Sequence, residues 1–393
     1  MGLPENAGTR LVAALVLLAA AGCRQSSPPA GGAAPATDAG SIQGAAAPAP
    51  PPPRGRDLAI LYSSNIQGHA VPCDCVRPLG GLARRATVIG RARAQADGAL
   101  IVDAGDLFGD RHHAPLLAAA MTAGGLDAFT PGERDLALGV AQLQRLAAAR
   151  QLPIISSNLT DAKGKRLFGA EKVVVVAGVP VGLFGVSQPP TPEDAARWEA
   201  AGIRVQPADA AAREAIAALR QAGAKVVVGL FHVGSPATSR RLVTGLAGLD
   251  WAVLGHSALN LDTPEKAGTA RLLEAFAEGK NLGRLDLHVV GDDFAFADAG
   301  QRSELESILA DHRRQLGEYD KSLGGMDPAA LEAYYQQRRA QLGAAIARET
   351  EALARLPRAI TGSWFENRII PLEPTIPDDR NVEGLVRRLD PHL

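Results

Sequence analysis

The sequence predicts an α/β protein, and two observations carry this prediction. Over residues 57–291, short runs rich in Val, Ile and Leu are bounded by glycine and alternate with stretches of helical apolar spacing. Polar residues directly follow several of these runs, which is where an α/β sheet usually binds its ligand. The 393-residue chain has a formal net charge of −1 and no aromatic-basic repeat, so we expect no nucleic-acid partner.

The first 22 residues have the pattern of a lipoprotein signal peptide. Arg10 precedes the apolar run LVAALVLLAAAG, which is too short to span a bilayer as a stable helix. The run ends in AAGC, and small residues directly before Cys23 resemble a bacterial lipobox, although Ala20 stands where leucine is usual. On this interpretation, Cys23 becomes the lipid-bearing first residue; an ordinary signal peptide or an anchor helix is the alternative.

Residues 23–56 form a segment rich in Pro, Ala and Gly without apolar periodicity. Such a segment buries too little surface to offset the entropy of ordering it, so we expect a disordered tether. The lipidated cysteine would then be the contact with the membrane. We expect an exported, lipid-anchored protein of the bacterial cell envelope, on its periplasmic or extracellular side.

Residues 57–300 form the main predicted domain, with these elements in chain order. The expected strands are 57–64, 98–106, 127–132 (short and extended), 153–159, 172–178, 180–187 and 225–234. The expected helices are 82–95, 114–125, 138–151, 211–222 and 239–246. The runs 249–257, 270–279 and 282–291 complete the pattern.

Residues 301–357 change character and predict a helical hairpin. The first helix spans 301–323, with apolar residues on one face at Leu305, Ile308, Leu309, Leu316 and Tyr319. Two glycines then end it, and Asp327 and Pro328 provide an N-cap and first-turn proline for a helix running to about residue 353. We interpret the charged faces as solvated surface; docking of a protein partner is the alternative.

Residues 358–393 are expected to pack back on the core. Residues 360–372 have the pattern of one or two strands, and 382–389 that of a short helix.

Four segments of residues 58–290 line up with a known family. They are LYSSNIQGH followed by GGLARRATVIGRARA, LIVDAGDLFGD, MTAGGLDAFTPGERDLALG, and the pair VVGLFHVG and WAVLGHSALN. In this order they resemble the 5′-nucleotidase branch of the calcineurin-like metallophosphoesterases. The resemblance implies two β-sheets packed face to face and flanked by helices, with the site at the strand ends. The chain after residue 290 is too short for the family's usual C-terminal nucleoside-recognition domain.

The resemblance also implies two metal ions that hold a phosphate ester and generate the attacking hydroxide. The first family motif, Asp-x-His, is Asn65-Ile66-Gln67 here, so both positions have lost their usual ligand; Asn65 and Gln67 can offer only uncharged carbonyl oxygens. The second motif keeps Gly105 and Asp106, the position that bridges the two metals.

The remaining motifs are partly kept. In the third, Glu133 replaces an amide ligand, and Arg134 replaces the histidine that assists the leaving group. Arginine donates no proton near neutral pH but can hold a phosphate. The fourth motif keeps His232, and the fifth keeps His256 but has Ala258 at its second histidine. Metal would be held by Asp106, Glu133, His232 and His256, with one or two divalent ions, or none.

The loop after the first strand carries His69, Cys73 and Cys75. These three residues could hold zinc or copper. Alternatively, the cysteines form a short disulfide, which is either a strained, redox-active pair or a static staple. Nearby, His112 and His113 are interpreted as surface histidines rather than substitute ligands.

Two functions follow. The first is a membrane-anchored 5′-nucleotidase-like phosphoesterase that hydrolyses nucleotides or other small phosphate esters at a reduced or altered metal site, with Asp106 and Arg134 as catalytic residues. The alternative is a catalytically inactive relative that acts as a binding or thiol-redox protein through the Cys73/Cys75 loop.

Overall fold

The structure is a computed structural model that describes residues 55–322 and 328–389, without the side chains of 319–322, 328–333 and 389. The predicted signal peptide, Cys23, nearly all of the tether, and the turn with Asp327 lie outside the described residues.

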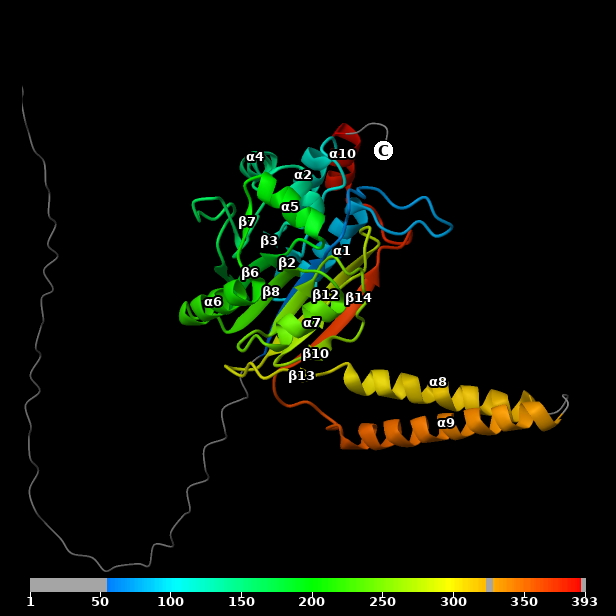
Figure 1. Cartoon of the computed structure of the whole chain (residues 1–393). Helices are drawn as coiled ribbons and strands as arrows, with labels where there is room; N and C mark the ends of the chain where they lie inside the picture. The colour runs from blue at the N-terminus through cyan, green and yellow to red at the C-terminus, as the bar shows by residue number, and fades with distance from the viewer. Residues whose placement is uncertain (1–54, 323–327, 390–393) are drawn as a thin grey trace, which may run out of the picture. The chain divides into compact units, whose positions relative to one another are not determined.

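The described strands form two six-stranded sheets and one two-stranded pair (Figure 1). The first sheet has the order β13-β14-β12-β1-β2-β3. Its strands are β1 (Arg56–Ser63), β2 (Gly98–Asp103), β3 (Ala128–Phe129), β12 (Asn281–Val289), β13 (Ala297–Asp298) and β14 (Trp364–Pro371). The second sheet has the order β10-β11-β9-β8-β6-β5. Its strands are β5 (Lys172–Val176), β6 (Val179–Ser187), β8 (Val226–His232), β9 (Trp251–Leu254), β10 (Glu265–Ala267) and β11 (Ala270–Leu273), and the small pair is β4 (Leu159–Thr160) with β7 (Arg204–Val205).

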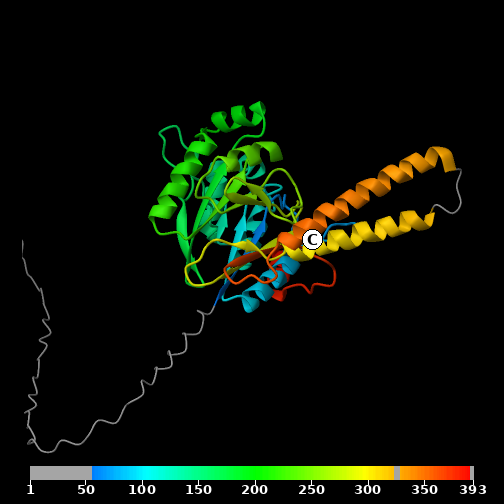
Figure 2. The same cartoon turned by 90° about the horizontal axis from the view of Figure 1, so that it is seen from below.

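Most helices of the described residues flank these sheets, whereas one pair of long helices projects from the body as a hairpin (Figures 1 and 2). They are α1 (Leu82–Gln95), α2 (Ala114–Ala123), α3 (Glu133–Ala137), α4 (Val140–Arg150), α5 (Pro192–Ala200), α6 (Ala208–Gln221), α7 (Pro236–Thr244), α8 (Gln301–Ser322), α9 (Pro328–Arg355) and α10 (Arg380–Leu389). The predicted α/β sandwich of two sheets flanked by helices is therefore confirmed.

Alternation along β1 explains how the layers are held together. Leu58, Ile60 and Tyr62 point to one face, where they join the buried side chains of β6 and β8 in a core between the two sheets. The residues between them, Ala59 and Leu61, belong to a second core that the first sheet shares with α1 and α2. A third core lies between the second sheet and helices α6 and α7.

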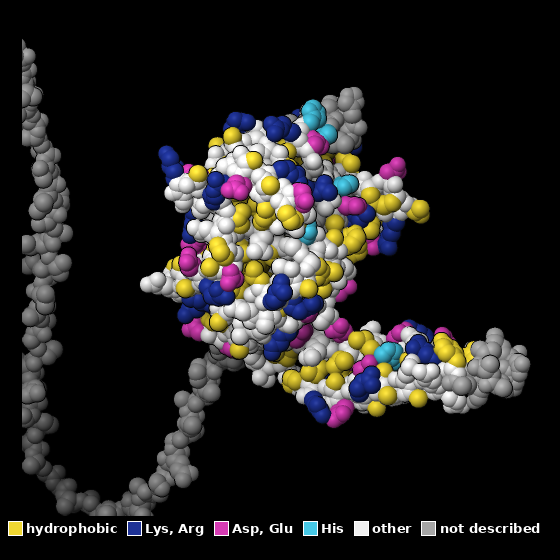
Figure 3. Space-filling model, in the orientation of Figure 1, with side chains coloured by type: hydrophobic (Ala, Val, Ile, Leu, Met, Phe, Trp, Pro, Cys, Tyr) yellow, Lys and Arg dark blue, Asp and Glu magenta, His cyan; other side chains and the backbone are white. Residues whose placement is uncertain are grey.

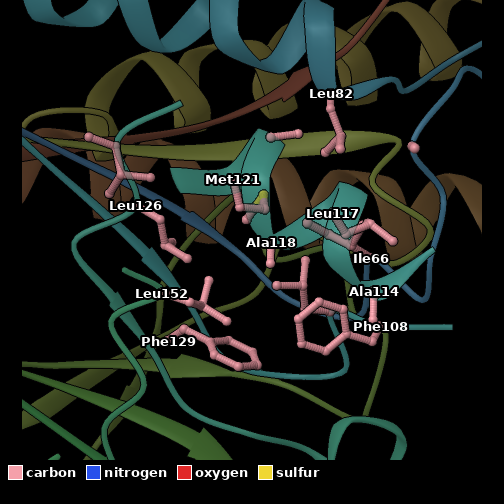
Figure 4. Packing of buried hydrophobic residues seen from close by; sticks show 14 of the residues in the cluster. Ile66, Leu82, Phe108, Ala114, Leu117, Ala118, Met121, Leu126, Phe129 and Leu152 are labelled. Atoms are coloured by element: carbon pink, nitrogen blue, oxygen red, sulfur yellow. The ribbon is translucent and has the colours of Figure 1, made fainter. Parts of the chain in front are cut away.

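The core under α2 also anchors two loops of the later site. Figure 4 shows Leu117, Ala118 and Met121 of α2 packed close to Ile66 and Phe108. Both of the latter are fully buried, and each lies in a loop that follows a strand end. Burial of such side chains stabilises the fold by about 1.5–3 kcal/mol each, so these loops are fixed by packing.

The segment 153–159 does not form the expected strand. It makes single bridges at Ile154 and Ile155, and only Leu159 enters the short β4. The segment crosses between the sheets: Ile155 N donates to the Phe129 carbonyl at 2.8 Å, and Ser157 N donates to the Gly185 carbonyl at 2.7 Å. The apolar content of this segment correctly predicts that it is buried. It does not form a strand because its backbone hydrogen bonds go to two different sheets.

Helix α5 was not predicted, although its start carries a recognisable signal. Thr191 caps it: the hydroxyl accepts from Asp194 N at 3.1 Å and donates to the Asp194 carboxylate at 2.7 Å. Pro192 occupies the first turn.

The C-terminal part adds one strand and one helix to the body. Residues 364–371 form a single strand, β14, paired antiparallel with β12, and α10 packs against α1 and α2. Helices α8 and α9 form the expected hairpin, with Leu309 and Leu342 buried and His312 bonded to Glu349 at 2.9 Å. None of the helices within the described residues is long and apolar enough to cross a membrane.

Surface charges are mixed on the face drawn in Figure 3. Lys and Arg side chains alternate there with Asp and Glu, in keeping with the net charge of −1. The visible face therefore presents no broad field of one sign.

Gly283 of β12 makes room for Tyr62 on the neighbouring strand, and we predict that Gly283→Ala is destabilising. The two residues are cross-strand partners, and an added Cβ would lie 2.1 Å from the Tyr62 ring. Tyr62 is buried and donates a hydrogen bond to Asn367 at 2.8 Å, so it has little freedom to move. We expect a loss of about 1–3 kcal/mol in the free energy of unfolding, measured by denaturant titration.

Gly90→Ala is the matched control. Gly90 is exposed within α1, and an added Cβ there meets nothing within 4 Å. We expect this substitution to stabilise the protein by about 0.5–1 kcal/mol. Equal effects of the two substitutions would contradict the packing at Gly283.

Candidate active site

The candidate site lies where four strands end. In the first sheet β1 ends at Ser63 and the parallel β2 at Asp103; in the second, β8 ends at His232 and the parallel β9 at Leu254. Within each pair the carboxyl ends share one edge, the usual ligand-binding edge of such sheets.

The turns at these ends have unusual backbone conformations. Left-handed φ values between 52° and 72° occur at Asn65, Gln67, Asp106, His256 and Ala258. Such values are uncommon for residues other than glycine and cluster at functional sites. The chain therefore turns sharply at three of the four strand ends.

The carboxylate of Glu133 joins the two histidines. Its Oε2 lies 2.6 Å from His232 Nε2, and its Oε1 lies 2.9 Å from His256 Nδ1. One ligand atom from each of these three residues fits within 4.8 Å of the others. His232 is fully buried, and its Nδ1 donates to the Ala104 carbonyl at 2.7 Å, which leaves Nε2 facing Glu133.

Asp106 lies beside this cluster. Its Oδ1 is 3.6 Å from His232 Nε2 and accepts a hydrogen bond from the backbone N–H of Arg134 at 2.9 Å. The Arg134 guanidinium is half exposed, with Nε 3.6 Å from Asp106 Oδ2. A cationic side chain thus stands between the buried carboxylate and solvent.

Three motif glycines form the space around the His232 ring. An added Cβ would lie 2.5 Å from a ring atom at Gly105, 2.5 Å at Gly132 and 2.6 Å at Gly255. Real Cβ contacts are not this short, so a side chain at any of the three would displace the imidazole. The glycines of the second, third and fifth motifs therefore all leave the space that the His232 imidazole occupies.

Asp135 ties the second and third motifs together. This fully buried residue accepts backbone N–H groups of Asp106 at 2.8 Å and Phe108 at 2.9 Å, and that of Gly132 at 2.7 Å. The sequence alone gave Asp135 no role. Its position directly after Glu133 and Arg134 was the feature of the sequence that could have indicated a role in the site.

A second set of buried polar residues, Ser63, Arg85 and Asp103, fixes the ends of β1 and β2. The Ser63 hydroxyl donates to Asp103 Oδ2 at 2.6 Å and accepts from Arg85 at 2.9 Å, while Gly105 N donates to Asp103 Oδ1 at 3.0 Å. Arg85 and Asp103 are both buried. Burial lowers the pKa of Arg85 to about 10 and raises that of Asp103 to about 6. The loops that carry the candidate site residues after β1 and β2 are thus held by a buried hydrogen-bond network.

Asn65 positions the His256 turn in this structure. Its side-chain oxygen, the atom expected to face a metal, accepts the backbone N–H of His256 at 2.9 Å. Its buried amide nitrogen finds no hydrogen-bond partner among the described residues. Gln67 is partly buried, and its backbone N–H donates to the Asp106 carbonyl at 2.8 Å.

The other candidate ligands do not join this cluster. His113 bonds Asp110 at 2.9 Å, and its ring packs edge-on against His112. His69 is exposed. Cys73 and Cys75 are paired with each other, with their Cα atoms 5.4 Å apart.

The electrostatics follow from burying several charges together. Burial opposes the charge on His232, but the hydrogen bond to Glu133 and the negative charges of Asp106 and Glu133 raise its pKa to about 9. Burial raises the pKa of Asp106 to about 6, despite the nearby His232. Against burial, the hydrogen bonds from both histidines hold the pKa of Glu133 well below its usual range. The cluster therefore has an ionised carboxylate at its centre.

Glu274 is a further buried carboxylate next to the His256 turn. It follows β11 and accepts the hydroxyl of Ser257 at 2.6 Å on Oε2. Its Oε1 is buried without a hydrogen-bond partner among the described residues. Burial raises its pKa to about 7, although the hydrogen bond from Ser257 opposes this. A lone glutamate in the apolar run RLLEAF was the signal in the sequence.

No family model matches the chain. Among curated proteins, the trifunctional nucleotide phosphoesterase protein YfkN of Bacillus subtilis is 25% identical over 281 residues, covering 58% of this chain and 19% of that protein. A probable 5′-nucleotidase of Treponema pallidum is 26% identical over 224 residues, covering 54% of this chain and 34% of the relative. The chain thus spans about a third or less of the length of these curated relatives.

Solved structures show the same fold. A 5′-nucleotidase precursor of Thermus thermophilus matches with a TM-score of 0.56 and 18% identity, covering 85% of this chain and 58% of that one. The phosphoesterase YfkN of Bacillus subtilis matches with a TM-score of 0.58 and 17% identity, covering 85% and 97%. Relatives and structural neighbours are thus 5′-nucleotidases and calcineurin-like phosphoesterases, which confirms the resemblance and the fold.

We predict that Glu274→Gln stabilises the protein more at pH 8 than at pH 5. The folded-state pKa of about 7 lies above the ordinary 4.5, so the folded protein holds this proton more tightly than the unfolded chain does. Its contribution to stability is therefore full below about pH 4.5 and is lost as the pH rises through about 7. Gln cannot ionise, so the stability gained by the substitution should grow by up to about 3 kcal/mol over this range.

The measurement is denaturant unfolding of both proteins at the two pH values. Glu214→Gln, at an exposed position in α6, is the control and should show no such pH-dependent gain. If the difference in the free energy of unfolding between Glu274→Gln and the parent does not change with pH, then ionising Glu274 does not destabilise the folded protein, and the prediction is wrong.

Proposed function

We propose that this chain is a metal-dependent phosphoester hydrolase of the 5′-nucleotidase type. It acts on nucleotides or other small phosphate esters at a reduced site that holds one divalent cation. The observation that carries the proposal is the convergence of Glu133, His232 and His256 at the ends of parallel strands. Nucleotide phosphoesterases among the relatives support the reaction class.

The residues present fit a divalent cation. One carboxylate and two imidazoles lie within 4.8 Å of one another, and Asp106 adds a second carboxylate 3.6 Å from His232. Imidazole with carboxylate suits zinc and other first-row transition ions. When bound, such an ion polarises a phosphoryl oxygen and lowers the pKa of a water molecule.

A second cation lacks the carboxylate and the imidazole ligands that the family uses at positions 65, 67 and 258. Asn65 and Gln67 carry no charge, and Ala258 has no donor atom in its side chain. The Asn65 oxygen is already bonded to His256 N. We infer that the positive charge of Arg134 takes over the binding of the phosphate.

Arg134 also limits the substrate. Its guanidinium can hold a phosphate with two hydrogen bonds but cannot donate a proton near neutral pH. Glu133 is ionised, and His232 and Asp135 are buried with their polar atoms engaged. Among nucleotides, the reaction should therefore favour the phosphoanhydrides of di- and triphosphates over monophosphates, because the phosphate leaving group departs without protonation. Aryl phosphates should react well for the same reason.

We further infer lipid anchoring at Cys23 on the outer side of a bacterial membrane, from the signal and tether patterns alone. Detection of a diacylglyceryl-modified Cys23 by mass spectrometry of protein from a bacterial host tests this. The alternative, an inactive binding or redox protein, is the outcome if neither metal binding nor hydrolysis is found.

Purified without chelators, the protein should contain about one divalent ion per chain. Glu133→Gln and His256→Ala should each lose the ion and nearly all hydrolysis of p-nitrophenyl phosphate. His112→Ala lies outside the cluster and serves as the control. Metal content is measured by elemental mass spectrometry, and two ions per chain would contradict the single-cation site.

Arg134→Ala should raise the KM for phosphate esters about tenfold to a hundredfold, because a charge-assisted hydrogen bond is lost. Arg134→Lys keeps the charge but loses the paired donors, so it should recover only part of the affinity. In the parent enzyme, kcat should rise steeply as the leaving group becomes more acidic. A flat dependence would show that another group supplies the proton.

A further inference from the structure

The segment between β1 and α1 carries two cysteines that the proposed hydrolysis does not use. Cys73 and Cys75 are paired, with one residue, Asp74, between them. Cys75 is exposed, whereas Cys73 is partly buried. Figure 1 shows this blue segment projecting from the body, and Figure 3 shows hydrophobic side chains along that edge.

Backbone hydrogen bonds close the loop without help from the disulfide. Cys73 N donates to the Leu79 carbonyl at 2.9 Å, and Pro72 forms a β-bridge with Gly80. Gly80 N in turn donates to the carbonyl of Leu372 in the body at 2.9 Å. A covalent ring around a single residue removes little entropy from the unfolded chain. A staple at this place therefore adds little to the stability of the fold.

The two sulfur atoms have different surroundings. The backbone N–H of Leu79 points to Cys73 Sγ at 3.3 Å. Cys75 Sγ lies 3.2 Å from the carbonyl oxygen of Arg77, whereas Cys73 Sγ is farther from that oxygen, at 3.9 Å. An N–H donor stabilises a thiolate, and a carbonyl oxygen does not. Cys73 is thus the better leaving group, and the exposed Cys75 is the sulfur open to attack.

An apolar surface accompanies the disulfide. Val76, next to Cys75, is fully exposed at 108% of its reference area. A hollow of about 270 Å³ lies beside the stem of the loop, and its lining is partly apolar, with Val71, Pro72 and Val386, and partly charged, with Asp378, Glu383 and Arg387. Such a surface suits a partner that carries its thiols on a protein.

We propose that Cys73–Cys75 is a thiol–disulfide exchange site that accepts two electrons from a dithiol. A thiolate of the donor attacks Cys75 Sγ and forms a mixed disulfide, while the Cys73–Cys75 bond breaks and Cys73 leaves as a thiolate held by Leu79 N–H. The second donor thiolate attacks the donor sulfur of the mixed disulfide and releases Cys75. The donor becomes a disulfide, and its two thiol protons pass to Cys73 and Cys75.

The test uses the full chain, with alkylation and mass spectrometry of the peptide that carries Cys73 and Cys75. Dithiothreitol should reduce the pair in the folded protein within about threefold of the rate in urea, because the attacked sulfur is exposed. The melting temperature and the metal content should not change. Protection by more than about a hundredfold in the folded state, or unfolding on reduction, would overturn the proposal. So would free thiols or bound zinc at this pair before any reductant is added.

Two comparisons separate the parts of the proposal. Leu79→Pro removes the N–H donor and should slow reduction about fivefold, whereas Leu79→Ala keeps the donor and the parent rate. Val76→Asp should slow reduction by reduced thioredoxin, used as a protein dithiol, but not by dithiothreitol. Cys73→Ser and Cys75→Ser should abolish exchange while metal content and hydrolysis persist, so failure of this proposal is distinct from failure of the proposed hydrolase. If reduction is equally fast in the parent and in both Leu79 variants, then the Leu79 N–H does not make Cys73 the preferred leaving group.

Discussion

The carboxylate of Glu133 holds the candidate site together, because both of its oxygens are engaged by imidazoles from two different strand ends. His232 comes from β8 and His256 from the turn after β9. His232 is buried, and Glu133 and His256 are partly buried, so their polar atoms would be left without partners in the absence of such pairing. Glu133 is also the first residue of α3, and Asp135, two residues later in the same helix, accepts a hydrogen bond from the turn after β2. The short helix α3 is therefore hydrogen-bonded to strand ends of both sheets.

This arrangement gives a physical account of the altered family motifs. The family resemblance implies an amide at position 133, where this chain has a carboxylate. It implies a carboxylate at position 65 and an imidazole at position 67, where this chain has amides. Negative charge has thus been lost at the end of β1 and gained at the start of α3. Charge has moved toward the histidines that survive, which favours a cation between them over a pair of cations.

Much of the fold could be predicted from the sequence. Helix α1 has the predicted bounds Leu82–Gln95, and β1, β2, β6 and β8 lie where apolar runs end in glycine or polar residues. Local patterns suffice there because each element buries one face. The segment around Ile155 was mispredicted because its hydrogen-bond partners lie on two sheets, which apolar content cannot reveal.

The site was only partly predictable. Family motifs placed Asp106, His232 and His256 in one region, and the structure brings them together with Glu133. The supporting groups were missed: Arg85 faces Ser63 across 22 residues, and Glu274 reaches back 17 residues to Ser257. Such contacts depend on how strands are ordered in a sheet, and a single sequence does not specify that order. The pairing of Cys73 with Cys75 was one of the alternatives weighed, and the structure adds which sulfur is exposed.

The pairing of the first sheet has a consequence for how the chain acquires its shape. β1 lies between β2, which follows it closely, and β12, whose residues are more than 200 positions later. β12 pairs on its other side with β14, near the end of the chain. Contacts of such long sequence separation form slowly, since a large loop must close first. The edge of β1 that pairs with β12 therefore stays open until β12 has been synthesised, more than 200 residues later, and that edge is the part most exposed to wrong pairing.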